Sequence, residues 1–574
     1  MPYPGPRNAF SRELHAAKYR SVGESFDECV SRVAGALADG DAHYHALREV
    51  LGEMRFLPGG RIQAAIGSSR GTTPYNCFVS GTIADSFVEG DGSIMQRATE
   101  AAQTMRLGGG IGYDFSTLRP RGAHIHRLES RSSGPVAFME IFDAVCRVTS
   151  SAGNRRGAQM GVLRVDHPDV EEFVHAKQNT DKLTGFNISV GVTDAFMRAV
   201  EQGDPFDLVF EGRTFRTIDA RALWNTIMRS NWDWAEPGVL FLDRINSSND
   251  LAYCETIAAT NPCGEQPLPP FGACLLGSFN LVQYLRFDGS DGDGGSKYRF
   301  DADAFDRDVA TVVRAMDNVV DRATYPLEEQ RREALAKRRV GLGVTGLANC
   351  VETLGHPYGT PAFLEEMASI LVRLRDGAFA ASTGLAREKG AFPLFDAERY
   401  GCGGFLETLP DELVRDVRRH GIRNSHLLSI APTGTISLCA DNVSSGIEPV
   451  FEYEAERRVL LDAGETTVVV RDHAFERFGV RGRVAADVSP DEHVDVLCTA
   501  QRYVDSAVSK TCNVPADTDW AAFADLYFRA WRGGAKGCTT YRVGGRREGV
   551  LRPVHVEERE AACRLVEGGR RECD

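Results

Sequence analysis

One short stretch of the chain places an amide, a thiol and a carboxyl group at alternate positions. The stretch is NPCGEQPLPPFGACLLGSFN, residues 261–280, and it begins with Asn261, Cys263 and Glu265. If the segment is extended, the three side chains point the same way, because side chains alternate across a strand. A thiol can give or take a hydrogen atom, a carboxylate can accept a proton from a hydroxyl group, and an amide can donate and accept hydrogen bonds. The spacing therefore favours one ligand that all three side chains contact.

The residues after Cys263 predict a stiff loop and exclude a continuous helix. Pro269 and Pro270 lie between Gly264 and Gly272, and neither residue type continues a helix well. Such a loop could carry Cys263 at its tip into a cavity. Alternatively, a lone cysteine packs in the core as a small hydrophobic side chain without a chemical role. Other parts of the chain have to decide between a reactive and a merely buried Cys263.

Two further segments have the composition of ligand-binding loops. A helix expected over 93–107 runs into LGGGIGYDF, where three glycines would let the backbone pass close to a ligand. The alternative is a helix end followed by a tight turn. An amphipathic helix expected over 135–149 is followed by SSAGNRRGAQMG, which predicts a polar loop with two arginines or a simple solvated turn.

The segment HLLSIAPTGTISLC, residues 426–439, predicts a strand that meets a helix start made of small residues. The first amide groups of a helix have no partner within the helix, and the helix dipole favours an anion there. The segment therefore predicts a phosphate cradle, with a proline-initiated helix capped by threonine as the alternative.

Together these motifs resemble the catalytic chain of ribonucleotide reductases, most closely the class II form that depends on adenosylcobalamin. In chain order they are PYNCFVSG, LGGGIGYDFSTLRPRG, SSAGNRRGAQMGVLRVDHPDVEEF, AATNPCGEQPLPPFGACLLGSFNL and LLSIAPTGTISLCADNVSSGIEPVF. The resemblance covers about residues 55–545. It implies an enzyme that reduces ribonucleotides, expected to be diphosphates, to 2′-deoxyribonucleotides through a thiyl radical.

The resemblance implies a role for each matching residue. Cys263 would become the thiyl radical that removes the 3′ hydrogen, Glu265 would be the general base, and Asn261 would orient the hydroxyl groups. Cys77 and Cys274 would supply two electrons and end as a disulfide. The other residues it implies are Asn76, Gly110, Pro432, Thr433, Gly434, Thr435 and Ile436 for the substrate, Asp85, Arg119, Arg155 and Gln159 for an effector nucleotide, and the tail thiols Cys563 and Cys573.

The source of the radical is also an expectation from the resemblance. Class I enzymes receive the radical through two adjacent tyrosines near the C-terminus, and this chain has no Tyr-Tyr pair. Adenosylcobalamin is therefore the expected cofactor, and no metal bound by protein side chains is expected. The expected partners are a dNTP or ATP effector, a thioredoxin-like reductant and a second copy of the chain in a homodimer. A class I-type large subunit and a non-catalytic nucleotide-binding relative are the alternatives.

Composition agrees with a folded enzyme and limits its partners. Of the 574 residues, 43% are hydrophobic and 25% are charged, which is typical of globular proteins. The net charge of −14 would repel a long polyanion, so nucleic acid is not an expected partner. The sequence has neither an apolar run long enough for a membrane span nor the apolar core of a signal peptide, so a cytoplasmic protein with reduced thiols is expected, without membrane contact.

The elements that must position these residues alternate between strand and helix, which indicates an α/β architecture. We expect a helical lead-in over 1–55 with a break near Gly40, a catalytic domain over 56–550 with an effector region around 80–165, and a flexible redox-active tail over 551–574. The run 288–297 is expected to be a flexible peripheral loop. The resemblance implies a ten-stranded α/β barrel of two five-stranded halves, with the cysteine-bearing finger loop through its centre.

Overall fold

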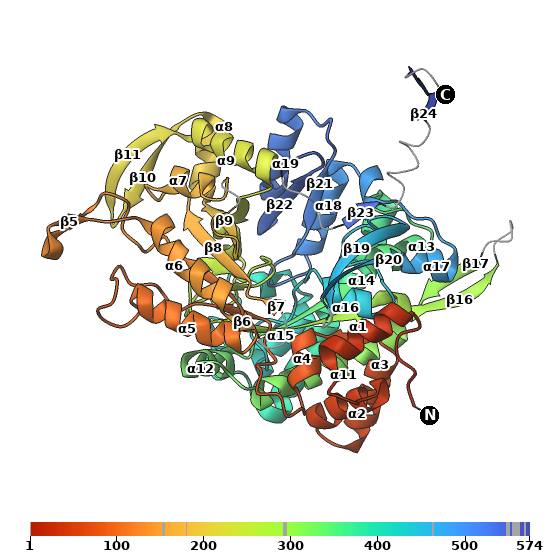
Figure 1. The fold of residues 1–574 in the computed structure, drawn as a ribbon. Coiled ribbons are helices and arrows are strands. Elements are labelled where there is room, and N and C mark those ends of the chain that lie inside the picture. Colours follow the sequence, from red (N-terminus) through yellow and green to blue (C-terminus); the bar gives the residue numbers. More distant parts are fainter. Residues whose placement is uncertain are drawn as a thin grey trace.

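The computed structural model describes residues 2–151, 155–178, 181–290, 296–461, 464–546, 551–553, 563–566 and 570–573. It is a mixed α/β molecule built around one ten-stranded sheet, with helices packed outside the sheet (Figure 1). Within this described part of the chain, none of the helices has the length and the apolar character that crossing a bilayer requires.

The lead-in forms three helices, and the predicted break near Gly40 is confirmed. The helices are α1 (Ala9–Tyr19), α2 (Phe26–Leu37) and α3 (Asp41–Gly52). Ser25 and Glu28 form a capping box at the start of α2, which satisfies amide groups that the helix leaves unpaired. Figure 1 shows these helices, in red, next to α16 (Gly434–Cys439) and α11 (Ala302–Arg322).

The first half of the barrel is a parallel sheet with helical crossovers. Its neighbouring strands are β2 (Cys77–Val79), β3 (Gly110–Asp114), β8 (Gln159–Arg164), β9 (Phe186–Val192) and β12 (Gly238–Phe241). The helices between them are α5 (Ile94–Arg106), α6 (Pro135–Val148), α7 (Val170–His175), α8 (Asp194–Gln202), α9 (Ala220–Trp234) and, after β12, α10 (Leu242–Ser247). The helices expected over 93–107 and 135–149 are thus confirmed to within a residue at each end.

The second half contains β15 (Ala273–Asn280), β18 (Val340–Thr345), β21 (Thr511–Val514) and β22 (Gly537–Arg542). It joins the first half through antiparallel pairs, β15 with β2 and β22 with β12. Its further helices are α12 (Glu328–Lys337), α13 (Leu347–Thr353), α14 (Pro361–Lys389), α15 (Asp411–His420), α17 (His473–Phe478), α18 (Pro490–Gln501) and α19 (Trp520–Arg532).

The strand expected over 426–431 is wrong as a continuous strand, because only Leu428 and Ile430 form bridges there. The amide groups of Leu427 and Leu428 instead donate to the two carboxylate oxygens of Asp505, at 2.7 and 2.8 Å. The Asp505 carboxylate thus accepts hydrogen bonds from backbone amides that would pair with a neighbouring strand in a regular β-ladder. The segment still connects β18 to the residues before β21, since Leu428 pairs in parallel with Leu342 and Ile430 with Val508. Segment 426–430 thus takes the fifth strand position of the second half, beside the four strands β15, β18, β21 and β22.

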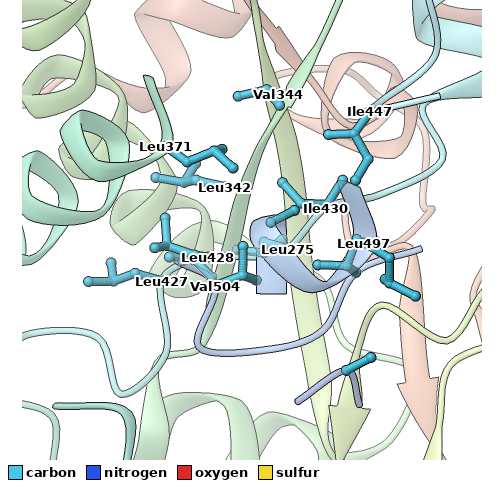
Figure 2. Packing of buried hydrophobic residues seen from close by; sticks show 14 of the residues in the cluster. Leu275, Leu342, Val344, Leu371, Leu427, Leu428, Ile430, Ile447, Leu497 and Val504 are labelled. Carbon is cyan, nitrogen blue, oxygen red and sulfur yellow. The ribbon is translucent and has the colours of Figure 1, made fainter. Parts of the chain in front are cut away.

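Apolar side chains pack this half against its helices. Figure 2 shows Leu275, Leu342 and Val344 of the sheet beside Leu371 of α14 and Leu497 of α18, all of them buried. A separate apolar cluster lies inside the barrel and combines side chains of β2, β8, β12 and β15 with Ala259 and Leu268. The interior is therefore filled by a segment that belongs to neither half.

The remaining elements lie at the periphery or close the ends. They include helix α4 (Gly60–Ala65), strand β1 (Phe56–Pro58), which pairs with β15, and the short helical turns η1 (His126–Leu128), η2 (Leu281–Tyr284), η3 (Phe405–Thr408) and η4 (Ala485–Asp487). The two-stranded pairs are β4 (His124–Ile125) with β5 (Ser130–Arg131), β6 (Ser150–Ser151) with β7 (Arg155–Arg156), β10 (Pro205–Phe210) with β11 (Arg213–Asp219), β16 (Leu285–Ser290) with β17 (Ser296–Phe300), and β24 (Cys563–Val566) with β25 (Arg570–Cys573). A three-stranded sheet consists of β19 (Glu454–Leu461), β20 (Gly464–Arg471) and β23 (Leu551–Pro553). The loop expected over 288–297 is partly strand in β16 and β17, and 291–295 lie outside the described residues. Most of the tail expected to be flexible also lies outside them.

Candidate active site

The finger loop is a hairpin whose tip is a tight turn. Its two strands are β13 (Ala259–Thr260) and β14 (Pro267–Leu268). At the tip the Gly264 amide donates to the Asn261 carbonyl at 3.1 Å, and Gly264 has a φ of +82°. The predicted loop is confirmed, but the extended arrangement of Asn261, Cys263 and Glu265 is wrong, because Pro262 and Gly264 favour a turn at these positions.

Asn261 holds the two sides of the turn together. Its backbone amide donates to the Gln266 carbonyl at 3.1 Å, and its side-chain oxygen accepts from the Gln266 amide at 2.9 Å. Its side-chain nitrogen donates to the sulfur of Cys77 at 3.0 Å. Asn261 therefore fixes the tip and contacts a neighbouring thiol.

Close backbone contacts place the hairpin inside the barrel. A Cβ atom on Gly112 would lie 1.8 Å from the Thr260 carbonyl oxygen, and one on Gly110 would lie 3.0 Å from the Pro262 ring. From β9 of the same half-sheet, the Asn187 side chain donates to the Pro262 carbonyl at 2.9 Å. The two glycines of β3 thus make room for the finger itself. The contact of Gly110 with substrate stays a prediction.

Cys77 and Cys274 lie directly opposite each other although they are far apart in sequence. They are register partners in the antiparallel pair of β2 and β15, and both are buried and reduced. Burial raises the pKa of both thiols well above the ordinary value. Residues facing each other on antiparallel strands have a Cα spacing within the range that disulfides adopt.

Glu265 lies beside this pair in a water-excluded position. The Cys77 sulfur is 4.0 Å from one carboxylate oxygen, and the other oxygen has no hydrogen-bond partner among the described residues. Only 1% of Glu265 is exposed, and burial raises its pKa to about 7. The Ser429 hydroxyl and the Ala507 amide each donate to its backbone carbonyl at 3.0 Å, so the second half of the barrel holds the residue in place.

The structure adds polar atoms that the sequence interpretation missed. Gln266 is fully buried, and within the described chain both of its side-chain amide atoms lack a hydrogen-bond partner. Its nitrogen and the Cys274 sulfur both border Gly341, where a Cβ would lie 2.6 and 3.1 Å from them. An oxygen of Asn76 is also without a described partner. Unpaired buried polar atoms are costly, so Gln266 and Asn76 are candidates for binding a polar group. The sequence signal that could have identified Gln266 is its position directly after Glu265 in the same motif.

The proposed phosphate cradle is the start of α16, which confirms the helix expected there. Thr433 precedes the helix with a φ of +55°, and its hydroxyl lies 2.9 Å from that of Thr345 and accepts from the Gly446 amide at 2.7 Å. The first intrahelical donor is Ser437, bound to the Thr433 carbonyl at 2.9 Å. The amides of 434–436 therefore remain at the helix start for an anion, and Thr435 is exposed there.

The predicted effector residues divide into a surface pair and a buried glutamine. Arg119 forms an ion pair with Asp85 at 2.6 Å, and both side chains are partly exposed. Gln159 is buried, accepts from the Tyr113 hydroxyl at 2.8 Å and donates to the Phe142 carbonyl at 3.2 Å. Arg155 lies in β7, and its side chain is outside the described part. A base contact by Gln159 stays a prediction and requires its side chain to leave these partners.

Comparison with known proteins agrees with this geometry. The chain matches the barrel domain of ribonucleotide reductase over residues 75–477 and 470–541. It is 36% identical to a vitamin B12-dependent ribonucleoside-diphosphate reductase of Mycobacterium tuberculosis, over 92% of this chain and 77% of that protein. A protein of the same name from Thermoplasma acidophilum is 35% identical over 87% of this chain and 65% of its own length. A vitamin B12-dependent ribonucleotide reductase of Rhodopirellula baltica is 27% identical over 81% of this chain and 52% of its own length.

Both the match and the identities extend over the parts of the chain that build the barrel, the finger hairpin and the opposed cysteines. The chain therefore belongs to the ribonucleotide reductase family.

Proposed function

We propose that this chain is the catalytic chain of an adenosylcobalamin-dependent reductase that converts ribonucleoside diphosphates to 2′-deoxyribonucleotides. The names of its relatives in Mycobacterium tuberculosis and Thermoplasma acidophilum support the cofactor and the diphosphate level of the substrate. The observation that carries the proposal is the buried pair Cys77 and Cys274, opposed across two strands beside Glu265 and below the finger tip.

The net reaction needs two electrons, and the opposed thiols can supply them. Loss of the 2′-hydroxyl group as water and its replacement by hydrogen consumes two hydrogen atoms. Cys77 and Cys274 each give up one, and a sulfur–sulfur bond forms between them. Each turnover thus yields one deoxyribonucleotide, one water and one disulfide, which an external reductant has to reopen.

The finger residues divide the remaining work. Cys263, as a thiyl radical, removes the 3′ hydrogen so that loss of the 2′-hydroxyl becomes easy. Glu265 accepts the proton of the 3′-hydroxyl, a role supported by its raised pKa and its unpaired oxygen. Asn261 orients the hydroxyl groups, and we add Gln266 because its buried amide has both atoms available for them among the described contacts.

The cofactor requirement fits the different accessibility of the cysteines. Cys263 is exposed at the turn, whereas Cys77 and Cys274 are buried. A radical formed from the cofactor would therefore have access to the thiol that starts the reaction, whereas the two thiols that supply the electrons are shielded. Adenosylcobalamin supplies an organic radical by homolysis of its cobalt–carbon bond. The hydrogen bond from Asn187 to Pro262 holds the neighbouring backbone while Cys263 reacts.

The substrate phosphates bind at the start of α16 in this proposal. The amides of 434–436 and the exposed Thr435 face the anion, and Pro432 and Thr433 set the entry angle of the helix. Asn76 and Gly110 border the nucleoside side of the site, next to Cys77 and Pro262. Ile436 is buried and anchors the helix.

An effector nucleotide, either dNTP or ATP, binds near Asp85 and Arg119, where two copies of the chain meet. The apolar residues Phe87, Val88 and Met95 are exposed around α5, as is Val148 at the end of α6. Exposed apolar side chains that gather on neighbouring elements support a protein interface. The residues around β6 and β7, including Arg155, connect this region to Gln159 at the start of β8 and so couple the effector to the substrate site.

The tail over 551–574 carries electrons from a thioredoxin-like reductant to the buried pair. Cys563 and Cys573 are register partners of β24 and β25, which supports their action as one dithiol. The chain thus consists of the lead-in 1–55, the catalytic barrel 56–550 with the effector region 80–165, and the redox-active tail.

The decisive experiment supplies purified protein with dithiothreitol and adenosylcobalamin, and offers CDP and CTP separately. Deoxynucleotide formation from CDP that requires the cofactor and no second protein is the expected result. Activity that appears only after a separate radical-generating subunit is added would favour a class I-type large subunit. Complete lack of turnover under both conditions, with nucleotide still bound, would favour a non-catalytic relative.

A further inference from the structure

The first helix of the chain contacts the last turn of the phosphate-cradle helix. Ser11 of α1 is buried, and its hydroxyl donates to the Leu438 carbonyl of α16 at 2.6 Å. The Tyr19 side chain at the other end of α1 hydrogen-bonds the thiol of Cys439. Figure 1 shows α1, in red, beside α16 and α4. Two residues of α1 thus bond to two consecutive residues at the end of α16.

The turn that ends α16 bonds to the residues just before α1. The two carboxylate oxygens of Asp441 accept from the amides of Asn8 and Arg7, at 2.8 and 3.1 Å. Asp441 and Asn442 have φ values of +60° and +56°, a conformation that costs free energy for residues other than glycine. The bonds from the N-terminal segment therefore help to hold a strained turn.

A short helix depends on such external support. α16 has six residues, and isolated helices of that length are unstable in water because the first turn is costly to form. Its position, and with it the direction of the amides of 434–436, is set by what packs against its end. α1 supplies a donor for the Leu438 carbonyl, and the Asp441 carboxylate is fixed by 7–8.

Helix α1 also packs against α4, which contacts the glycine run before β3. A Cβ on Gly60 of α4 would lie 2.5 Å from the Tyr19 ring, and His15 hydrogen-bonds Gln63 at 3.1 Å. The Arg61 guanidinium of α4 lies against Gly108, where a Cβ would come within 2.5 Å of it. Helix α1 therefore contacts the phosphate end of the site and, through α4, the glycine run that leads to Gly110.

We propose that α1 is a positioning element for the substrate phosphates, acting through Ser11 and Asp441 on α16. The inference rests on the proposed function of α16 as the phosphate cradle. Ser11 touches no substrate atom in this scheme. It holds the last turn of α16 and so sets the direction in which the helix start presents its amides to the phosphates.

The test compares KM and kcat for CDP in Ser11→Ala and Asp441→Asn, with Ser25→Ala as the matched control. The control removes a capping serine of α2 in the same lead-in, at a residue bonded only within its own capping box in the described contacts. We expect KM to rise about fivefold in the first two variants, which corresponds to about 1 kcal/mol, with kcat changed less than twofold. Inhibition by cytidine, which lacks phosphates, should be unchanged. Ser11→Thr keeps the hydroxyl and should restore the wild-type KM.

Two outcomes would contradict the proposal. A wild-type KM in Ser11→Ala and Asp441→Asn would overturn it, and so would an equal rise of KM in Ser25→Ala, because that would be a loss of general stability. The variant Thr435→Val distinguishes failure of the proposed role of α1 from failure of the proposed phosphate cradle, because Thr435 lies at the start of α16. A raised KM in Thr435→Val alone leaves the cradle in place and refutes the role of α1, whereas an unchanged KM in all variants refutes both.

Discussion

At the scale of single residues, the buried carboxyl group of Glu265 combines two properties that a base at this site needs. Burial raises its pKa to about 7, and one oxygen has no hydrogen-bond partner in the described structure. A carboxyl group half ionised near neutral pH can take a proton from a ribose hydroxyl and return it later. Because burial favours the neutral carboxyl group, ionisation of Glu265 lowers the free energy of unfolding.

Glu265→Gln should therefore lose activity and gain stability at alkaline pH. The pKa rises from 4.5 in the unfolded chain to about 7 in the folded one, so this group stabilises the fold below about pH 4.5 and that contribution is lost as the pH rises through 7. At pH 8 the variant should be more stable by about 2–3 kcal/mol, and turnover should fall at least about 100-fold. Thermal melts at pH 5 and pH 8 test this; an equal difference at both pH values would contradict the assignment of the pKa.

Cys263→Ser should abolish deoxynucleotide formation and leave nucleotide binding close to wild type. Serine has nearly the same shape, but its O–H bond is much harder to convert to a radical than the S–H bond. Cys402→Ser is the matched control, because Cys402 is also exposed but lies outside the finger. Product above the level of wild-type contamination in Cys263→Ser, measured by chromatography of CDP reactions, would remove Cys263 from its proposed role.

At the scale of elements, the finger hairpin depends on the absence of a side chain at Gly112 of β3. The Thr260 carbonyl oxygen occupies the place where a Cβ of Gly112 would be, at 1.8 Å. A methyl group there cannot be accommodated by rotating a side chain, since the oxygen belongs to the backbone and the backbone of residue 112 fixes the position of the Cβ. The position of the finger is therefore set by a contact between two elements.

Gly112→Ala should displace the hairpin and reduce kcat strongly, with a loss of stability of about 1–3 kcal/mol from overpacking. Gly71→Ala is the control, because nothing lies within 4 Å of a Cβ at Gly71. Steady-state kinetics and thermal melts of both variants measure the effect. Wild-type kcat in Gly112→Ala would show that the finger and β3 do not have to approach so closely.

At the scale of the whole molecule, the roles proposed for the effector region and the tail depend on communication between distant parts of the chain. Arg119→Ala removes the partner of Asp85 and should weaken effector affinity while basal activity remains. Arg373→Ala breaks a remote surface ion pair with Asp306 and should change neither. Equilibrium binding of dNTP and light scattering measure affinity and dimer formation. A protein that stays monomeric with saturating dNTP and still changes its substrate preference would contradict the interface.

Truncation after Arg552 should distinguish reduction by thioredoxin, which needs the tail, from reduction by dithiothreitol, which does not. The pair Cys77 and Cys274 is buried, and in the proposed function the opposed tail residues Cys563 and Cys573 exchange with it because a folded reductant is too large to enter. The truncated chain should retain one turnover per prereduced site and full activity with dithiothreitol, and lose multiple turnover driven by thioredoxin. Equal thioredoxin-driven rates in truncated and full-length protein would exclude the tail as the shuttle.

The amino-acid sequence by itself determined features that depend on neighbouring residues. The helices α5 and α6 begin and end within a residue of their expected positions, because caps, glycines and apolar spacing are local signals. The motif around Cys263 indicated thiol and carboxylate chemistry for the same reason, and it placed both groups on one loop.

Only the tertiary structure decided what depends on residues from distant parts of the chain. It set Cys77 against Cys274, enclosed Glu265 until its pKa rose to about 7, and buried Gln159 against Tyr113. It also replaced the strand expected over 426–431 by two bridges, since Asp505 takes the amides of Leu427 and Leu428. Pairing, burial and competition for a hydrogen-bond donor are properties of the folded arrangement, so no local pattern contains them.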